Sequence, residues 1–195
     1  MALVAAAAIA LAFAPAAWLC ALEFDRDAIL RGELWRLWSA HLVHFSPAQA
    51  MLDALLFLLS GAMAARTLRI DFRWRDLLLA APLISLALLW LAPDLAAYRG
   101  LSGLASATLL LAGIGIDSRW PASRPWLWCC AAAMLLKTVA DAGGFAAGFG
   151  TLPEGVRLEW RAHALGAMAA AMWWWMARRR KTPAAITVQL QQGTI

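Results

Sequence analysis

Six long apolar stretches, separated by short charged segments, constrain the fold of this chain more than any single motif does. Of its 195 residues, 63% are hydrophobic and only 15% are charged. A soluble domain of this size could not bury so much apolar surface, so we predict an all-α, polytopic membrane protein. The net charge of +5 could suggest a nucleic-acid partner. However, the basic residues lie between and after the apolar stretches, as membrane topology signals do, and we expect no nucleic acid.

Each apolar stretch is predicted to form one transmembrane helix, because about twenty residues cross a bilayer core of about 30 Å. Glu23–Ser46, rich in tryptophan and charge, is predicted to be an interfacial loop with short helices. Asp117–Pro125 is predicted to be a polar turn, and Gly143–Gly155 a mobile glycine-rich loop. The six expected spans are Met1–Leu22, Pro47–Ala65, Asp76–Ala92, Leu101–Ile116, Trp126–Ala142 and Glu159–Ala177. Together they define a membrane domain over residues 1–181, followed by a polar, disordered tail over residues 182–195.

The distribution of charge predicts the orientation of these spans. With six spans, both termini face the same side of the membrane. If that side is the cytoplasm, the inner segments hold ten basic and three acidic residues, and the outer segments hold six basic and eight acidic residues. The positive-inside rule therefore favours cytoplasmic termini. Ser102, at the start of the fourth span, and His163, early in the sixth, then lie at one depth near the outer surface.

Ser102 stands in the sequence Gly100-Leu101-Ser102-Gly103, directly before an apolar helix. A serine is a good nucleophile only when a base takes its proton. Unpaired N–H groups at the N-terminus of the following helix would favour a developing oxyanion, and the two glycines would let a substrate backbone approach. Taken alone, however, this pattern favours ordinary small-residue packing between membrane helices.

His163 is the candidate base, in a similar position at the start of the sixth span. It could instead be a polar residue that hydrogen-bonds to a neighbouring helix, but ionisable groups within membrane spans are costly and usually functional. Gly166, Ala167 and Ala170 follow at helix-face spacing. With Ser106 on the fourth helix, they would allow the close helix contact that a Ser–His hydrogen bond needs.

Four pieces of sequence, taken in order, resemble the rhomboid intramembrane serine proteases across essentially all six spans. They are Trp35-Arg36, the run His41-Leu42-Val43-His44-Phe45-Ser46, Gly100-Leu101-Ser102-Gly103, and Ala162-His163-Ala164-Leu165-Gly166. The resemblance implies a six-transmembrane-helix bundle in which Ser102 is the nucleophile and His163 is the general base. It implies a dyad without a third acid, no metal and no cofactor. It also implies that the arginine-containing first loop is a membrane-embedded structural loop.

The second helix departs from the rhomboid pattern. Rhomboids typically carry His-x-x-x-Asn there, and these side chains help the serine amide to bind the oxyanion. The matching positions hold Gln49 and Asp53. Gln49 can donate a hydrogen bond, whereas Asp53 can donate only when protonated and could equally be a structural polar contact. With Gly100 and His44, these residues are expected to support the oxyanion site.

Four further residues within the apolar stretches are expected to be structural. Lys137 lies one turn before Asp141 and is expected to pair with it, or alternatively with Asp53. The other three are cysteines without metal-ligand spacing, which we expect to be small core or lipid-facing residues. They are Cys20, Cys129 and Cys130.

The compact six-span chain resembles the rhombosortase subgroup in particular. The resemblance rests on the run Tyr98-Arg99-Gly100-Leu101-Ser102-Gly103, the aspartate in the second helix and the lysine in the fifth. This subgroup is associated with bacterial proteins that carry a C-terminal signal: a Gly-Gly motif, one hydrophobic span and a basic tail. The resemblance implies a protease of the bacterial inner membrane whose site opens to the periplasm and whose partners are such membrane-anchored proteins. The alternatives are a general rhomboid protease of single-span substrates, an inactive rhomboid-like protein that binds clients, and a small transporter or channel. A transporter would need polar groups across the bilayer, whereas here they crowd near the outer face.

Overall fold

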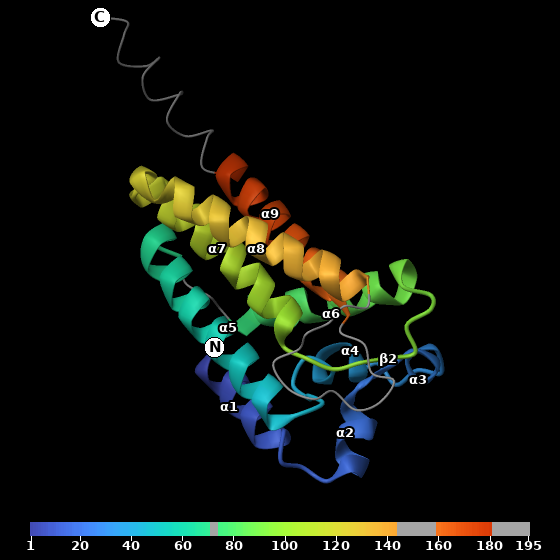
Figure 1. Cartoon of the computed structure of the whole chain (residues 1–195). Helices are drawn as coiled ribbons and strands as arrows, with labels where there is room; N and C mark the ends of the chain where they lie inside the picture. The colour runs from blue at the N-terminus through green and yellow to red at the C-terminus, as the bar shows by residue number, and fades with distance from the viewer. Residues whose placement is uncertain (71–73, 144–158, 181–195) are drawn as a thin grey trace, which may run out of the picture.

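The computed structural model describes residues 1–70, 74–143 and 159–180. Within these ranges the chain is mostly helical, and its one very small sheet has strand β2 beside the short helices α3 and α4 (Figure 1). The predicted tail, and the predicted glycine-rich loop beyond Gly143, lie outside the described residues. The elements are α1 (Ala2–Leu11), α2 (Ala16–Leu22), β1 (Phe24–Asp25), α3 (Arg26–Leu30), α4 (Arg36–Ser39), α5 (Pro47–Leu68), α6 (Trp74–Leu91), β2 (Ala97–Tyr98), α7 (Ser102–Arg119), the 3-10 helix η1 (Pro121–Ser123), α8 (Arg124–Ala142) and α9 (Trp160–Arg180).

The N-terminal stretch is not the single span that the sequence predicts. It forms two helices, α1 with 10 residues and α2 with 7, and the break ends at Pro15, whose backbone is extended. Proline cannot donate the helical hydrogen bond and disfavours a helical conformation in the residue before it. Ten helical residues reach only about 15 Å, half the thickness of a bilayer core. The prediction of one continuous Met1–Leu22 helix is therefore wrong.

The predicted polar turn Asp117–Pro125 is also shorter than expected. α7 continues through Asp117 to Arg119, and α8 already begins at Arg124. The connection is the short helix η1, which starts at Pro121, where a proline is well tolerated in the first turn. The turn therefore joins α7 and α8 as a tight hairpin.

The centre of the molecule consists of α5, α7 and α9, with α7 in contact with both other helices. Small residues allow the contacts. A Cβ atom added to Gly115 of α7 would collide with the side chain of Thr67 on α5, and one added to Gly166 of α9 would collide with the carbonyl oxygen of Gly103 on α7. The predicted close packing by Gly166 is thus present, and its partner is the backbone at Gly103. Backbones that approach this closely hold the helices in one register.

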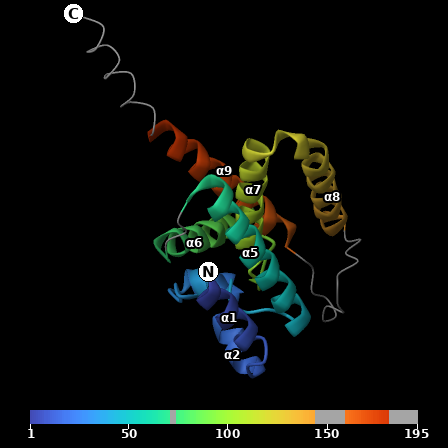
Figure 2. The same ribbon diagram turned by 90° about the vertical axis from the view of Figure 1, so that its left-hand side faces the viewer.

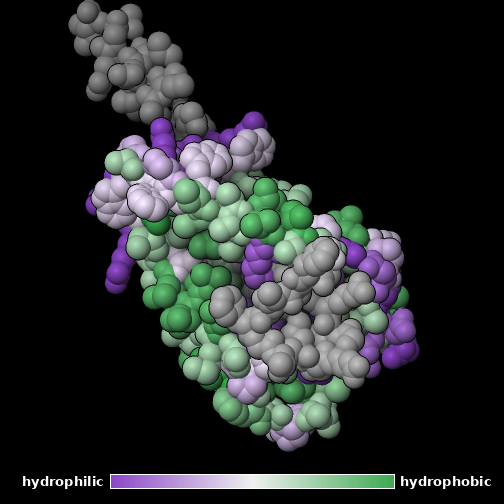
Figure 3. Space-filling view, viewed as in Figure 1, coloured by the Kyte–Doolittle hydropathy of each residue, from purple (hydrophilic) through white to green (hydrophobic). Residues whose placement is uncertain are grey.

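In contrast, α8 stands to one side of this core (Figure 2). Its large apolar side chains are mostly exposed, for example Trp126 at 75% and Leu136 at 70%. Figure 3 shows a broad hydrophobic area with hydrophilic residues at its upper and right-hand edges. Among the described residues, α5 alone is long and apolar enough to qualify as a membrane span by length and composition. The expectation of six spans therefore stays a prediction at this point.

A two-stranded sheet that the sequence analysis does not predict joins the first loop to the segment before Ser102. β1 and β2 pair antiparallel, with Phe24 opposite Tyr98 and Asp25 opposite Ala97. Phe24 and Tyr98 are both buried, at 0% and 4% exposed. The short helices predicted within Glu23–Ser46 are present as α3 and α4. The first loop therefore forms one unit with the chain that leads into α7.

Two buried side chains fasten the first loop to the helices around it. Arg36 donates to the carbonyl oxygens of Cys20 at 2.7 Å and Glu23 at 2.8 Å, which ties α4 to the end of α2. His41 lies with its Nε2 atom 3.0 Å from the carbonyl oxygen of Ala81 on α6. Burial lowers the pKa of His41 to about 4, so its ring stays neutral near pH 7. Both residues therefore hold backbone in place.

Candidate active site

Ser102 and His163, which lie far apart in the sequence, line the same small cavity. The cavity and its open mouth together hold about 310 Å³ of space not filled by atoms. The first loop, α5, β2, α7 and the start of α9 all contribute to its wall. The lining residues are Phe45, Gln49, Ala97, Tyr98, Arg99, Ser102, Glu159 and His163.

Three long helices begin at this cavity. α5 is capped by Ser46, whose hydroxyl accepts from the amide of Gln49 at 3.2 Å. α7 begins at Ser102 itself, and His163 lies in the first turn of α9. A helix N-terminus carries unpaired N–H groups and a partial positive charge. Three such termini around one cavity make it favourable for developing negative charge.

The backbones of α7 and α9 touch directly beside the two candidate catalytic residues. A Cβ atom at Gly103, the residue after Ser102, would lie 3.1 Å from the carbonyl oxygen of Ala162, the residue before His163. Ala162 is completely buried. One turn further along α9, Gly166 packs on the carbonyl of Gly103. This contact fixes the depth of Ser102 relative to that of His163.

Gly100 lies next to Ser102 Oγ and to the side chains of Gln49 and Asp53, the two residues of the second helix that depart from the rhomboid pattern. Its φ of +141° is strained for any residue with a side chain. A Cβ atom there would lie 3.3 Å from Gln49 Nε2, 3.5 Å from Asp53 Oδ2 and 3.6 Å from Ser102 Oγ. The Gly100 amide donates to the carbonyl oxygen of Ala40 at 3.1 Å. Gly100 therefore leaves room for the polar atoms of α5 to approach Ser102.

The orientation of Gln49 is set by the first loop. Its Oε1 accepts a hydrogen bond from the backbone amide of Phe45 at 3.1 Å. Because a backbone amide can only donate, the other end of the side chain is the NH₂ group, and this end lies beside Gly100. Gln49 thus presents hydrogen-bond donors to the region around Ser102.

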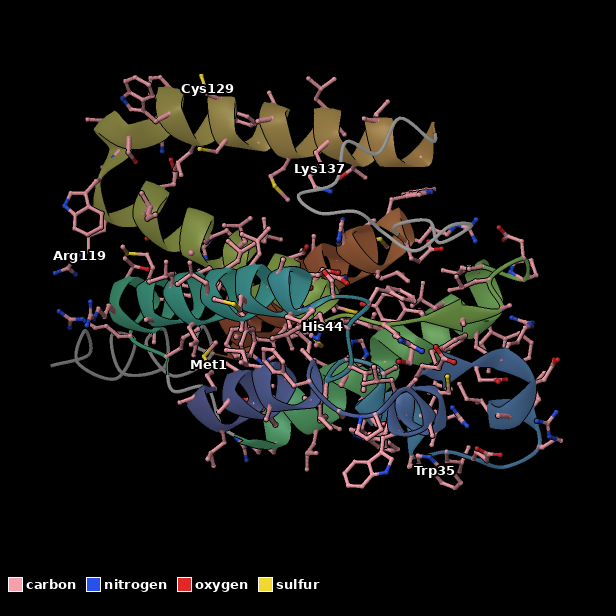
Figure 4. All side chains as sticks on the ribbon, turned by 60° about the horizontal axis from the view of Figure 1, so that its bottom comes forward. Met1, Trp35, His44, Arg119, Cys129 and Lys137 are labelled. Atoms are coloured by element: carbon pink, nitrogen blue, oxygen red, sulfur yellow. The ribbon has the colours of Figure 1, made fainter. Side chains whose placement is uncertain are left out.

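His44 holds the peptide just before Ser102 and takes no part in lining the cavity. Its Nε2 accepts from the amide of Leu101 at 3.1 Å and lies 3.4 Å from Asp53 Oδ2. The ring is buried in the interior near the start of α5, whereas Trp35 and Arg119 lie at the periphery (Figure 4). Asp53 Oδ2 has no hydrogen-bond partner among the described residues. Of the four predicted supporting residues, Gln49 lines the cavity, Gly100 and Asp53 lie beside Ser102, and His44 acts through the backbone.

The Rhomboid domain family matches residues 31–180, about three quarters of the chain. The chain belongs to the rhomboid family. Its helices therefore form a membrane bundle, as the apolar stretches predict. The matched region includes the whole cavity and leaves out α1 and α2. No curated protein and no solved structure matches the sequence.

Tyr98 is a residue of this rhomboid site to which the sequence analysis gives no role. Its hydroxyl donates to the carbonyl oxygen of Gly100 at 2.7 Å. Burial raises the pKa of Tyr98, a hydrogen bond with Ser102 opposes this rise, and the charges of Asp53 and Glu159 add to it. The available signal was a tyrosine two residues before Gly100, the first glycine of the motif around Ser102. Tyr98 connects the carbonyl of Gly100 with the Ser102 side chain.

Arg99 and Glu159 are the two charged residues of the cavity wall, and neither was predicted as a site residue. Arg99 is paired with Glu23 at 2.8 Å and lies over the Phe45 ring, 4.9 Å from its centroid. Glu159 is largely buried, and its Oε1 accepts a hydrogen bond from the Arg161 amide at 3.0 Å. The sequence analysis treats Glu159 only as the start of the sixth span.

The remaining predictions concern Lys137, the cysteines and metals. Lys137 lies on α8, and the side chain of its predicted partner Asp141 is outside the described set, so this pairing stays a prediction. The cysteines are free thiols. Within the described residues, no cluster of His, Cys, Asp and Glu has the arrangement of a metal site.

Proposed function

We propose that this rhomboid is an intramembrane serine endopeptidase in which Ser102 is the nucleophile and His163 is the general base. The observation that supports this is the shared cavity of the two residues, beside the backbone contact of Gly103 with Ala162. Acyl transfer requires a nucleophile, a base and donors for the oxyanion. All three kinds of group line or adjoin the cavity.

The reaction follows from these positions. His163 accepts the hydroxyl proton while Ser102 Oγ attacks the scissile carbonyl carbon, and the carbonyl oxygen takes up the electron pair. The Ser102 amide and the Gln49 NH₂ group donate to this oxyanion. As the tetrahedral intermediate collapses, the imidazolium gives its proton to the leaving amine, and an acyl-serine remains. A water molecule, deprotonated by His163, then hydrolyses the ester and restores Ser102.

A serine-directed fluorophosphonate probe tests this proposal on the purified protein in detergent. Mass spectrometry should find the adduct on Ser102, and the Ser102→Ala variant should remain unlabelled. A folded wild-type protein that is not labelled would instead support the inactive, client-binding alternative.

Gln49 is expected to contribute to turnover as an oxyanion donor. Gln49→Ala should lower kcat by up to roughly a hundredfold with a much smaller effect on KM, because the donor acts mainly in the transition state. Gln49→Glu is the matched variant, since it can still accept from the Phe45 amide but no longer donates when ionised. Kinetics on a fluorogenic peptide would measure both. If Gln49→Ala turns over normally, Gln49 is a structural residue.

We further propose a bacterial inner-membrane location, with cytoplasmic termini and a cavity that opens to the periplasm. The cavity lies at the N-terminal ends of α5, α7 and α9. Their C-terminal ends carry Arg66, Arg119, and the pair Arg178 and Arg179. Basic residues at this end support the orientation predicted by the positive-inside rule.

The substrate we propose is a protein with a C-terminal Gly-Gly motif, one hydrophobic span and a basic tail, as the resemblance to rhombosortases implies. An intact helix keeps its amides bonded and does not present a carbonyl to Ser102. Glycine lowers the cost of unwinding by about 1 kcal/mol per residue relative to alanine. Cleavage near the motif would release the passenger into the periplasm.

Replacing both glycines of this signal with leucine should slow cleavage strongly, because the segment then unwinds less readily. A passenger fused to the signal would be co-expressed with the wild-type enzyme or with Ser102→Ala, and the products would be sized by mass spectrometry. Equal cleavage of the leucine version, or cleavage only of unrelated single-span proteins, would contradict the sorting-signal specificity. A general rhomboid protease would then be the better description.

A further inference from the structure

We propose that Glu159 is a positioning residue for His163, whose carboxylate favours the imidazolium that forms when His163 takes the Ser102 proton. This inference rests on the proposed protease function. It adds an acid to a catalytic pair that the family resemblance implies to be without one.

Glu159 is held beside the site by the N-terminus of α9. It directly precedes Trp160, the first residue of that helix, and His163 follows one turn later. Its Oε1 accepts from the amide of Arg161 at 3.0 Å, so the side chain folds back over the helix end as a cap. Only 11% of the side chain is exposed, and both Glu159 and His163 line the cavity. The carboxylate therefore shares a poorly solvated space with the imidazole.

The cation closest to Glu159, Arg161, is shared with a second carboxylate, that of Asp94. The Arg161 guanidinium donates two hydrogen bonds to Asp94, at 2.7 and 2.8 Å, while its Nε lies 3.5 Å from Glu159. One cation is thus shared by two carboxylates, and the cluster has a net charge of −1. The other cation of the cavity wall, Arg99, is already paired with Glu23 at 2.8 Å. The fixed charge beside His163 is therefore negative.

A negative charge at this position stabilises the imidazolium of His163. His163 lies in the first turn of α9, where the partial positive charge of the helix end disfavours a cation. A carboxylate within about 4–6 Å acts in the opposite direction. The field of Glu159 already reaches across the cavity, because it contributes to the raised pKa of Tyr98, the hydrogen-bond partner of Ser102.

The other ionisable groups around the cavity are the same in the wild-type protein and in the Glu159→Gln variant tested below. A difference between the two proteins in the pH–rate profile therefore reports on the charge of Glu159. The groups on the elements packed around His163 are Tyr98 and Arg99 before α7, His44 and Asp53 at α5, Asp94 after α6, Lys137 on α8, and Arg161 on α9.

The decisive variant is Glu159→Gln, which can still accept from the Arg161 amide but carries no charge. We expect kcat to fall about tenfold with KM nearly unchanged, because one unit of lost proton affinity on the base is a factor of ten. The acid limb of the pH–rate profile should move to lower pH by about one unit. Fluorophosphonate labelling of Ser102 should show the same shift without any peptide substrate.

Asp117→Asn is the matched control, since it neutralises a carboxylate that is paired with Arg124 near the C-terminal end of α7, outside the cavity wall. It should leave the pH profile in place. An unchanged profile in Glu159→Gln, with or without a lower thermal stability, would overturn the role of Glu159 and leave the protease proposal intact. Absence of Ser102-dependent cleavage and labelling in the wild-type protein would overturn both.

Discussion

Replacing His163 with alanine is expected to lower cleavage at least about 10⁴-fold, although Ser102 remains in place. Without a base in the cavity, the serine hydroxyl keeps its proton and is a poor nucleophile. His163 is partly exposed to the cavity, so its removal should not unfold the protein. Cleavage in detergent micelles, together with loss of fluorophosphonate labelling, would measure the effect.

Two further variants serve as controls: Ser102→Ala alone, and Ser102→Ala combined with His163→Ala. Since the two residues act as one unit, each single variant and the double variant should lose nearly the same activity. Substantial cleavage by His163→Ala would mean that another group takes the Ser102 proton.

Gly166→Val is expected to abolish activity almost as completely by a different route. Even a Cβ atom at this position collides with the carbonyl oxygen of Gly103, so α9 must move away from α7. A displacement of about 1 Å between reacting groups can cost about a hundredfold in rate, and overpacking typically costs about 1–3 kcal/mol of stability. Both effects should appear together, in turnover and in the thermal unfolding temperature.

Gly113→Val is the matched control, because Gly113 lies on α7 with open space at its Cβ position. The intrinsic helix preference changes equally in both variants, by a few tenths of a kcal/mol in favour of valine. Gly113→Val should therefore remain active and stable. Equal behaviour of the two variants would contradict a close backbone contact at Gly166.

The N-terminal ends of α5, α7 and α9 meet at the cavity. This arrangement explains how an oxyanion site can form although the second helix carries Gln49 and Asp53 in place of the histidine and asparagine typical of rhomboids. Three helix ends supply N–H donors and partial positive charge around Ser102. A glutamine at position 49, oriented by the Phe45 amide, needs only to add one donor to this environment. The histidine and asparagine typical of rhomboids are then not required for an oxyanion site.

The sequence by itself determined the class of protein and the two residues at the centre of the site. Apolar stretches of about twenty residues can satisfy their backbone in a membrane only as helices, so composition and periodicity predict the bundle. The pairing of Ser102 with His163 also followed, because each residue begins an apolar stretch that runs in the same direction. The family match over residues 31–180 confirms the rhomboid assignment.

Other features depended on contacts between distant segments, which no local pattern encodes. The pairing of Phe24 with Tyr98 and the bond from the Leu101 amide to His44 are of this kind. From the sequence alone, Glu159 is indistinguishable from any charged residue at the end of a membrane span. Only the tertiary structure places it in the cavity wall, because the turn of α9 and the backbone contact at Gly103 decide which side chains share the space around Ser102.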